Sequence, residues 1–115
     1  MITIVIDTEN GIALPESKIE KAVQDAVDSW NADPESEHLW TIGQDTIFAH
    51  IRLQVAKGAV DYENIRVFWT ETGDYYEIND YGNLRNWPHG MFRATTDAIE
   101  KIVRIQLNKR KEARG

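Results

Sequence analysis

Three carboxylates follow the apolar stretches that would form neighbouring strands of a parallel sheet. Asp7 and Glu9 come directly after residues 3–6, and Asp45 comes shortly after residues 39–43. Ligands of such sheets collect at the carboxyl ends of the strands, and carboxylate oxygens bind Mg²⁺. The three acids are therefore low-ranking candidates for a metal-dependent phosphoesterase or nuclease centre. The competing interpretation is that Asp7 caps the turn that follows it.

Other patterns of catalytic residues do not occur in this sequence. The three histidines, His38, His50 and His89, lack the spacing of metal ligands. No serine lies in a nucleophile elbow, and the phosphate-cradling motif Gly-x-x-x-x-Gly-Lys-Ser/Thr does not occur. Cysteine is absent, which removes disulfides and thiolate chemistry. We therefore predict no catalytic residue, no metal and no cofactor.

Aromatic residues are dense in the second half of the chain. Two aromatic stretches, residues 65–71 and 75–79, flank a glycine-containing turn and predict an antiparallel hairpin. Because side chains alternate across a strand, we expect one ring of each neighbouring pair to face the core. We expect Phe68 and Tyr76 to take that position.

The remaining aromatic residues are predicted to face outward. Trp69 and Tyr75 lie on the other side of this alternation, and Tyr81 and His89 follow in turns. Exposed aromatic side chains are typical of protein-binding surfaces, so these four are the candidate partner-binding residues. The alternative is that the last helix covers this side of the hairpin.

The segment GNLRNWPHGMF, residues 82–92, is too apolar for an ordinary loop and too interrupted for a helix. We expect Trp87 to fill the gap where the hairpin meets the sheet and Pro88 to stiffen the exit. Gly82 and Gly90 would permit the turns on either side. These four residues are interpreted as structural.

The elements that must position these residues follow from hydrophobic spacing. Residues 3–7 are apolar on both alternating faces, which predicts a strand covered on both sides. Helical spacing follows from Glu16, and a second helix is expected from about Asp45 to Gly58. A strand-helix-strand-helix-strand order predicts a partly parallel α/β sheet with right-handed crossovers and an antiparallel hairpin at its edge.

We therefore expect one α/β domain with about three helices over residues 1–115. Residues 1–60 would form the strand-helix-strand-helix unit, and residues 61–92 the hairpin with the Trp-Pro segment. Residues 93–115 would form the last helix with a basic tail.

Taken in order, these motifs resemble the C-terminal half of predicted bacterial AAA/ABC-type ATPases related to the overcoming-lysogenization-defect proteins. IVIDTENGIALP (residues 4–15) is similar to their Walker B strand and turn, and residues 82–92 are similar to the Trp-Pro-x-Gly-Phe ending of their C-terminal domain of unknown function. The resemblance places Asp7 at the Walker B position and either Thr8 or Glu9 at that of the catalytic glutamate.

The departures from that family bear on activity. Gln44 stands where the family has its switch histidine, and Asp45 stands where serine is usual. Glutamine cannot carry a proton at neutral pH as histidine does. Because the phosphate cradle is missing as well, the resemblance implies an inherited scaffold without ATP hydrolysis.

Charge is divided unevenly along the chain. Residues 1–100 hold 7 Lys/Arg and 18 Asp/Glu, a balance of −11, whereas residues 101–115 hold 6 Lys/Arg and 1 Glu, a balance of +5. The acidic body disfavours nucleic acid, and the basic tail fits the C-terminal end of a helix dipole. A tail that contacts RNA, an acidic partner or the body itself is the alternative.

The apolar run within the first ten residues is too short for a signal peptide or a membrane span, and an acidic residue follows it too soon. We accordingly expect a cytoplasmic protein without membrane contact. Its predicted role is non-catalytic binding of another protein, as an inhibitor, immunity or regulatory protein, with an ATPase, a toxin or a nuclease as partner.

Overall fold

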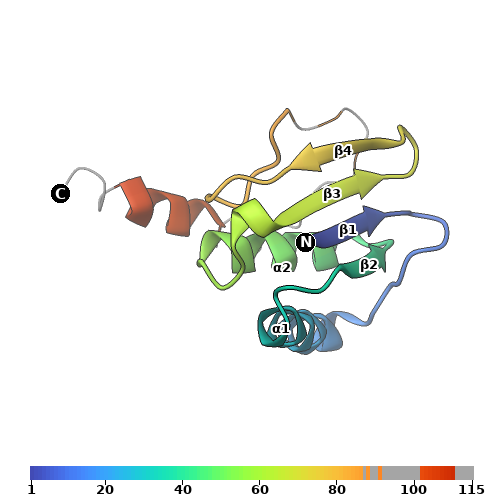
Figure 1. The fold of residues 1–115 in the computed structure, drawn as a ribbon, viewed down its shortest axis with the longest axis horizontal. Coiled ribbons are helices and arrows are strands. Elements are labelled where there is room, and N and C mark those ends of the chain that lie inside the picture. Colours follow the sequence, from blue (N-terminus) through green and yellow to red (C-terminus); the bar gives the residue numbers. More distant parts are fainter. Residues whose placement is uncertain (87, 89–90, 92–101, 111–115) are drawn as a thin grey trace.

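The computed structural model describes residues 1–86, 88, 91 and 102–110 (Figure 1). Its named elements follow one another as β1 (Ile2–Ile6), α1 (Glu16–Ala32), β2 (His38–Ile42), α2 (Asp45–Ala56), the 3₁₀ turn η1 (Tyr62–Asn64), β3 (Ile65–Trp69) and β4 (Asp74–Glu77). Residues 102–110 are helical. Trp87, His89 and Gly90, together with residues 92–101 and 111–115, lie outside the described residues.

The four strands form one mixed sheet in the order β2-β1-β3-β4. β1 pairs in parallel with both β2 and β3, and β3 pairs antiparallel with β4. The predicted α/β class, with a partly parallel sheet and an antiparallel hairpin at its edge, is therefore confirmed. Because β1 lies in the centre, its side chains define the two faces of the sheet.

The core lies on one face of this sheet. Ile2, Ile4 and Ile6 are 3%, 0% and 0% exposed and belong to one cluster with the buried residues of both helices. α1 and α2 also pack against each other, and both lie on that face (Figure 1). The prediction that the first strand is covered on both sides holds in part. No described helix packs on the other face, yet Thr3 is only 7% exposed there, and Arg66 Nε donates to its Oγ1 at 3.2 Å.

The crossovers correct a second expectation. The connection through α1 leads from β1 to the outer strand β2, and the connection through α2 leads back past β1 to β3. Two crossovers that run in opposite directions over the same face have opposite hands, so they cannot both be right-handed as predicted. The reason is the route of the chain after β1, which passes around the end of β2.

Ile12 shows this route most clearly. Its N–H donates to the carbonyl of Thr41 (3.1 Å), and its own carbonyl accepts from the N–H of Gly43 (2.9 Å). These bonds place Ile12 on the outer edge of β2, because the inner edge is already paired with β1. The chain then enters α1 on the face that α2 also covers.

The helices form where the spacing predicted them. α1 follows Pro15, whose carbonyl accepts from the N–H of Lys18 at 2.9 Å, and it buries residues three or four positions apart: Ile19, Val23, Val27 and Trp30. α2 ends in a Schellman motif, in which Gly58 adopts a φ of 82° and Ala59 donates to the carbonyl of Gln54 at 3.0 Å. The predicted stop at Gly58 is confirmed.

A buried arginine joins α2 to the turn after β4. Arg52 is 8% exposed, and its Nε donates to the carbonyl of Gly82 at 2.7 Å. Its guanidinium also donates to Asn83 Oδ1 at 2.9 Å. Burial lowers the pKa of this guanidinium from its ordinary value, yet the group stays protonated at any physiological pH. The contact fixes the turn that precedes the Trp-Pro segment.

We predict that Gly82→Ala destabilises the fold by about 2–4 kcal/mol, because alanine would be strained in the left-handed backbone conformation and its Cβ would overpack the site. Gly82 has a φ of 78°, and a Cβ there would lie 2.4 Å from the carbonyl oxygen of Arg52. Gly73→Ala is the matched control, since its φ is 70° but nothing lies within 4 Å of the added Cβ. Urea unfolding of both variants measures the difference; equal losses would show that the contact with Arg52 is unimportant.

Candidate functional site

Asp7 stands at the carboxyl end of β1 and organises the turn that follows. Its Oδ1 accepts the backbone N–H groups of Glu9 and Asn10, both at 3.1 Å, and its Oδ2 accepts from Asn10 Nδ2 at 3.4 Å. The hydrogen bond from the Asn10 backbone is the main cause that lowers the pKa of Asp7 below its ordinary value. The turn-capping interpretation therefore describes what this carboxylate does in the structure.

Asp45 takes no part in that arrangement. It begins α2, and its Oδ1 accepts the N–H of Thr46 at 2.8 Å. The preceding Gln44 accepts the N–H of Leu14 at 2.9 Å through its side-chain carbonyl. Among the residues that the structure describes, no group of three or more His, Cys, Asp or Glu side chains could hold a metal ion. The hypothesis of a metal centre built from Asp7, Glu9 and Asp45 thus gains no support.

A hollow of about 320 Å³ lies beside the Asp7 turn. It is lined by Asp7, Thr8, Glu9, Asn10, Thr70 and Glu71. Thr70 is the first residue after β3, and both its N–H and its Oγ1 donate to the carbonyl of Ile6 at 3.1 Å. The hollow therefore lies between the loops that follow the two central strands, at the edge where the sequence placed Asp7 and Glu9.

The face of the sheet opposite the helices is the larger feature. The strand register places side chains on it in rows, of which the first contains Leu39, Thr3, Arg66 and Glu77 and the second contains Thr41, Val5, Phe68 and Tyr75. We call these eight residues the open face. Leu39 is 71% exposed and Tyr75 is 56% exposed, although both are large and apolar in body.

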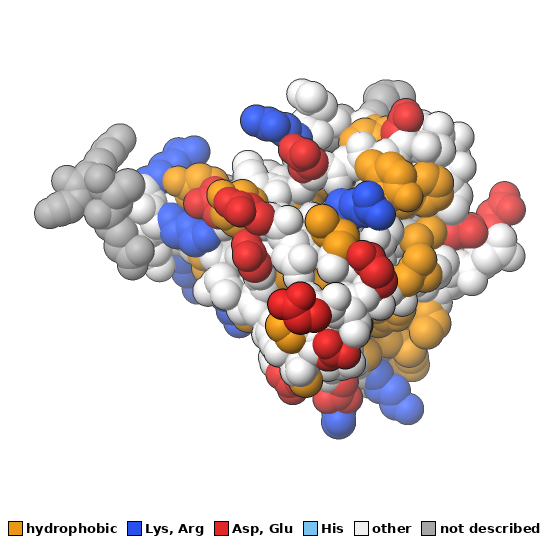
Figure 2. Space-filling view, viewed as in Figure 1, with side chains coloured by type: hydrophobic (Ala, Val, Ile, Leu, Met, Phe, Trp, Pro, Cys, Tyr) orange, Lys and Arg blue, Asp and Glu red, His pale blue; other side chains and the backbone are white. Residues whose placement is uncertain are grey.

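Figure 2 shows this side of the molecule. Hydrophobic side chains gather over the strands around a basic group, and carboxylates surround them. Several of these carboxylates lie at the end where the arrows of β1 and β3 terminate in Figure 1. The visible surface is thus apolar at its centre and acidic at its border.

The aromatic pair of the open face, Phe68 on β3 and Tyr75 on the edge strand β4, is held in a fixed arrangement. The Phe68 and Tyr75 rings lie 5.0 Å apart between centroids. The Arg66 guanidinium carbon lies 4.3 Å from the centroid of the Tyr75 ring, and Arg66 Nε donates to Thr3 Oγ1 at 3.2 Å. Such cation–π and aromatic contacts favour particular orientations of the side chains.

The structure shows which side chains of the hairpin face the core, and this overturns the prediction for one site residue. Trp69, expected to face outward and contact a partner, is 5% exposed and belongs to the core cluster, against which the partly buried Tyr76 also packs. Phe68, expected in the core, lies on the open face beside Tyr75. The rows of β1 explain the difference, since Trp69 pairs with the buried Ile6 and Phe68 pairs with Val5. The outward position predicted for Tyr75 is correct.

The other predicted residues fall elsewhere. Tyr81 is half-buried: its carbonyl accepts from Gln106 Nε2 at 3.1 Å, and Lys109 Nζ lies 5.5 Å from its ring centroid. It thus contacts the described part of the last helix. Gly82 takes the predicted turn conformation, and Pro88 is half-buried. The partner role predicted for His89 and the structural roles of Trp87 and Gly90 lie outside the described residues.

Sequence reasoning missed Leu39, Val5, Phe68 and Arg66 as members of one surface. The available signal was the composition of β1, whose even-numbered positions are all isoleucine, whereas one of its odd-numbered positions is a threonine. That asymmetry indicates which face is buried and, through the register, which aromatic residues of the hairpin face outward.

Comparison with protein-family models, with curated proteins and with solved structures found no match. Among the described residues, no helix is long and apolar enough to cross a membrane. The site must therefore be interpreted from its own geometry.

We predict that Trp69→Ala lowers the free energy of unfolding by about 3–5 kcal/mol, as for other buried aromatic residues. Tyr75→Ala should lower it by less than about 1 kcal/mol, because an exposed ring loses little on truncation. Urea denaturation of the two variants measures both values. A larger loss for Tyr75→Ala than for Trp69→Ala would contradict the assigned phase of the hairpin.

A second prediction concerns pH. The pKa of Asp7 is lower in the folded state than in the unfolded chain. The folded state therefore binds fewer protons at this carboxyl while it titrates. Asp7 thus stabilises the fold above its unfolded pKa of about 4, and this contribution is lost as the pH falls through the folded pKa. Asp7→Asn keeps an oxygen acceptor but removes the titration. Urea melts from pH 7 downward should show a shallower acid-induced loss for Asp7→Asn than for the wild type; parallel curves would exclude the effect.

Proposed function

We propose that this chain is a non-catalytic protein-binding module whose open face docks onto another protein. It would act as an inhibitor, immunity or regulatory protein, with an ATPase, a toxin or a nuclease as the class of partner. The observation that carries the proposal is the face of the sheet on which no described helix packs. Leu39 and Tyr75 are 71% and 56% exposed on it, and Phe68 lies against the Tyr75 ring.

The topology supports this interpretation. Sheets built from parallel strands are usually covered on both faces, because helical crossovers pack on each side. Here the three parallel strands carry α1 and α2 on one face only. A partner that covers the second face would complete the arrangement typical of parallel strands.

The composition of the face supports it as well. Aromatic and arginine side chains are enriched in the centres of protein interfaces, surrounded by polar residues that exclude water. The Tyr75 ring contacts both Phe68 and Arg66 on the β3–β4 side of the open face. Glu77 lies in the Arg66 row on the same edge strand and pairs with Arg85 at 3.3 Å. The rings are already positioned, so binding would require little further ordering.

The sequence resemblance adds an ancestry to the proposal. A scaffold derived from the distal half of an ABC-type ATPase would retain β1 beside β2 in parallel, and that pairing is present. In doubly wound α/β proteins helices cover both faces of the sheet, so the loss of one layer would accompany the loss of the phosphate cradle.

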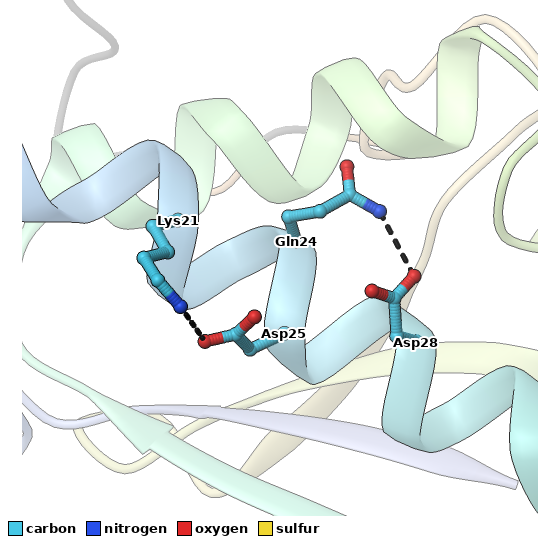
Figure 3. Close-up of polar contacts among 4 residues, drawn as sticks. All are labelled: Lys21, Gln24, Asp25 and Asp28. Atoms are coloured by element: carbon cyan, nitrogen blue, oxygen red, sulfur yellow. Dashed lines mark hydrogen bonds and ion pairs between the residues drawn. The ribbon is translucent and has the colours of Figure 1, made fainter.

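The experiment compares two variants that carry the same added charge. Leu39→Glu/Tyr75→Glu places two carboxylates on the open face. Gln24→Glu/Ser29→Glu places two on the outer side of α1, where Gln24 donates to Asp28 at 3.0 Å beside the Lys21–Asp25 ion pair (Figure 3). Both variants should fold, because all four altered positions are exposed.

Tagged forms of the wild type and both variants are used for affinity capture from the native cell extract, and the captured protein is then purified. We expect 1:1 binding by calorimetry that the α1 variant preserves and the open-face variant weakens at least about tenfold, because two buried charges oppose docking. Equal affinity of the two variants for the partner would contradict the proposed surface.

A further inference from the structure

The hollow beside Asp7 is a continuation of the open face. The odd-numbered residues of β1 and the even-numbered residues of β3 lie on that face. Asp7 directly follows β1 and Thr70 directly follows β3. Both line the hollow, which therefore adjoins the end of the aromatic row.

The charged residues that line the hollow are all acidic. Three of the residues that line the hollow are acidic, namely Asp7, Glu9 and Glu71, and none is basic. Glu9 and Glu71 are exposed. Asp7 is kept ionised by the N–H groups that it accepts, which lower its pKa. The hollow therefore presents negative charge at neutral pH beside an apolar surface.

Two acidic hollows repel each other in one arrangement of a symmetric dimer. A two-fold symmetric dimer apposes the same patch from both protomers. The lining of the hollow carries the carboxylates of Asp7, Glu9 and Glu71 and no basic residue. On the open face Glu77 is instead paired with Arg85 at 3.3 Å. A two-fold axis that runs along the strands would bring the two hollows face to face, and such contact between like charges costs several kcal/mol in protein complexes.

From this complementarity we infer that the occupant of the open face is a basic protein surface, which lays apolar side chains over Phe68 and Tyr75 and inserts an arginine or lysine side chain into the hollow. The inference rests on the proposed function and names the chemistry of the partner. It also orients the partner, because the inserted cation must lie at the carboxyl end of β1 and β3.

The chemistry of the hollow favours arginine in particular. A guanidinium donates five hydrogen bonds in a fixed planar arrangement and pairs with carboxylates through two of them. The hollow offers carboxylates from two different loops, residues 7–10 and 70–71. Acids around a docking face also raise the association rate of a basic partner at low ionic strength.

The test uses a small probe in place of the partner. ¹⁵N-labelled protein is titrated with N-acetyl-arginine methylamide at low ionic strength, with the neutral isostere N-acetyl-citrulline methylamide as the control probe. We expect saturable amide shifts at Thr8, Glu9, Asn10, Thr70 and Glu71 with the arginine probe and none with the citrulline probe.

Charge-neutral variants locate the binding. Glu9→Gln/Glu71→Gln should lower the affinity for the arginine probe by about threefold to tenfold, as expected for the loss of two exposed ion pairs. Asp7 is left unchanged because it caps the turn. The matched control, Glu35→Gln/Glu37→Gln, removes the same charge before β2, at the opposite edge of the sheet, and should leave the affinity unchanged.

Several outcomes would overturn the inference. They are equal shifts with the citrulline probe, no saturable shift at residues 7–10 and 70–71, or equal weakening by the two double variants. If the arginine probe fails but the Leu39→Glu/Tyr75→Glu variant still loses the captured partner, the proposed function stands and the assigned partner chemistry is wrong. If the arginine probe binds but that variant retains the partner, the open face is not the docking surface. Both the proposed function and the inferred partner chemistry are then wrong.

Discussion

The pairing of β1 with parallel strands on both sides determines most of this structure. Its position fixes the register of β2 and β3 at once, and the register fixes which side chains share a face. Burial of Ile2, Ile4 and Ile6 makes that register strict, because a shift by one residue would turn all three toward the open face and place Thr3 and Val5 against the helices. The core, the open face and the acidic hollow are therefore all consequences of one alternation along five residues.

In the part of the chain that the structure describes, helices cover one face of the sheet, because α1 and α2 pack on the same side. α1 and α2 contact each other as well as the sheet, so they form one layer over the isoleucines of β1. The other face is left with Phe68, Tyr75 and Leu39, which the chain holds in place by short-range contacts such as that between Arg66 and the Tyr75 ring. If the open face is a docking surface as proposed, substitutions on the helix side would act on folding, whereas those on the open face would act on binding.

Much of the fold could be predicted from local patterns, and the errors share a cause. The spacing in α1, the stop at Gly58 and the hairpin each depend on residues close in the chain, and each agrees with the structure. Strand pairings between distant segments determine the side on which Trp69 lies and the hands of the crossovers. The alternation of residues within one stretch does not contain that information. At the candidate site the sequence indicated Asp7, Glu9 and Tyr75 but proposed a metal centre with Asp45, whose carboxylate instead accepts from Thr46. The docking role of the open face stays a prediction.

The pairing of Ile12 with the outer edge of β2 has a consequence for solubility. An unprotected edge strand offers free backbone groups to which another chain can add. On one side of this sheet Ile12 occupies part of that edge, and on the other side Arg85 donates to the carbonyl of Glu77 at 2.9 Å. Both margins are therefore partly closed to strand addition, which disfavours edge-to-edge association of the sheets of two chains.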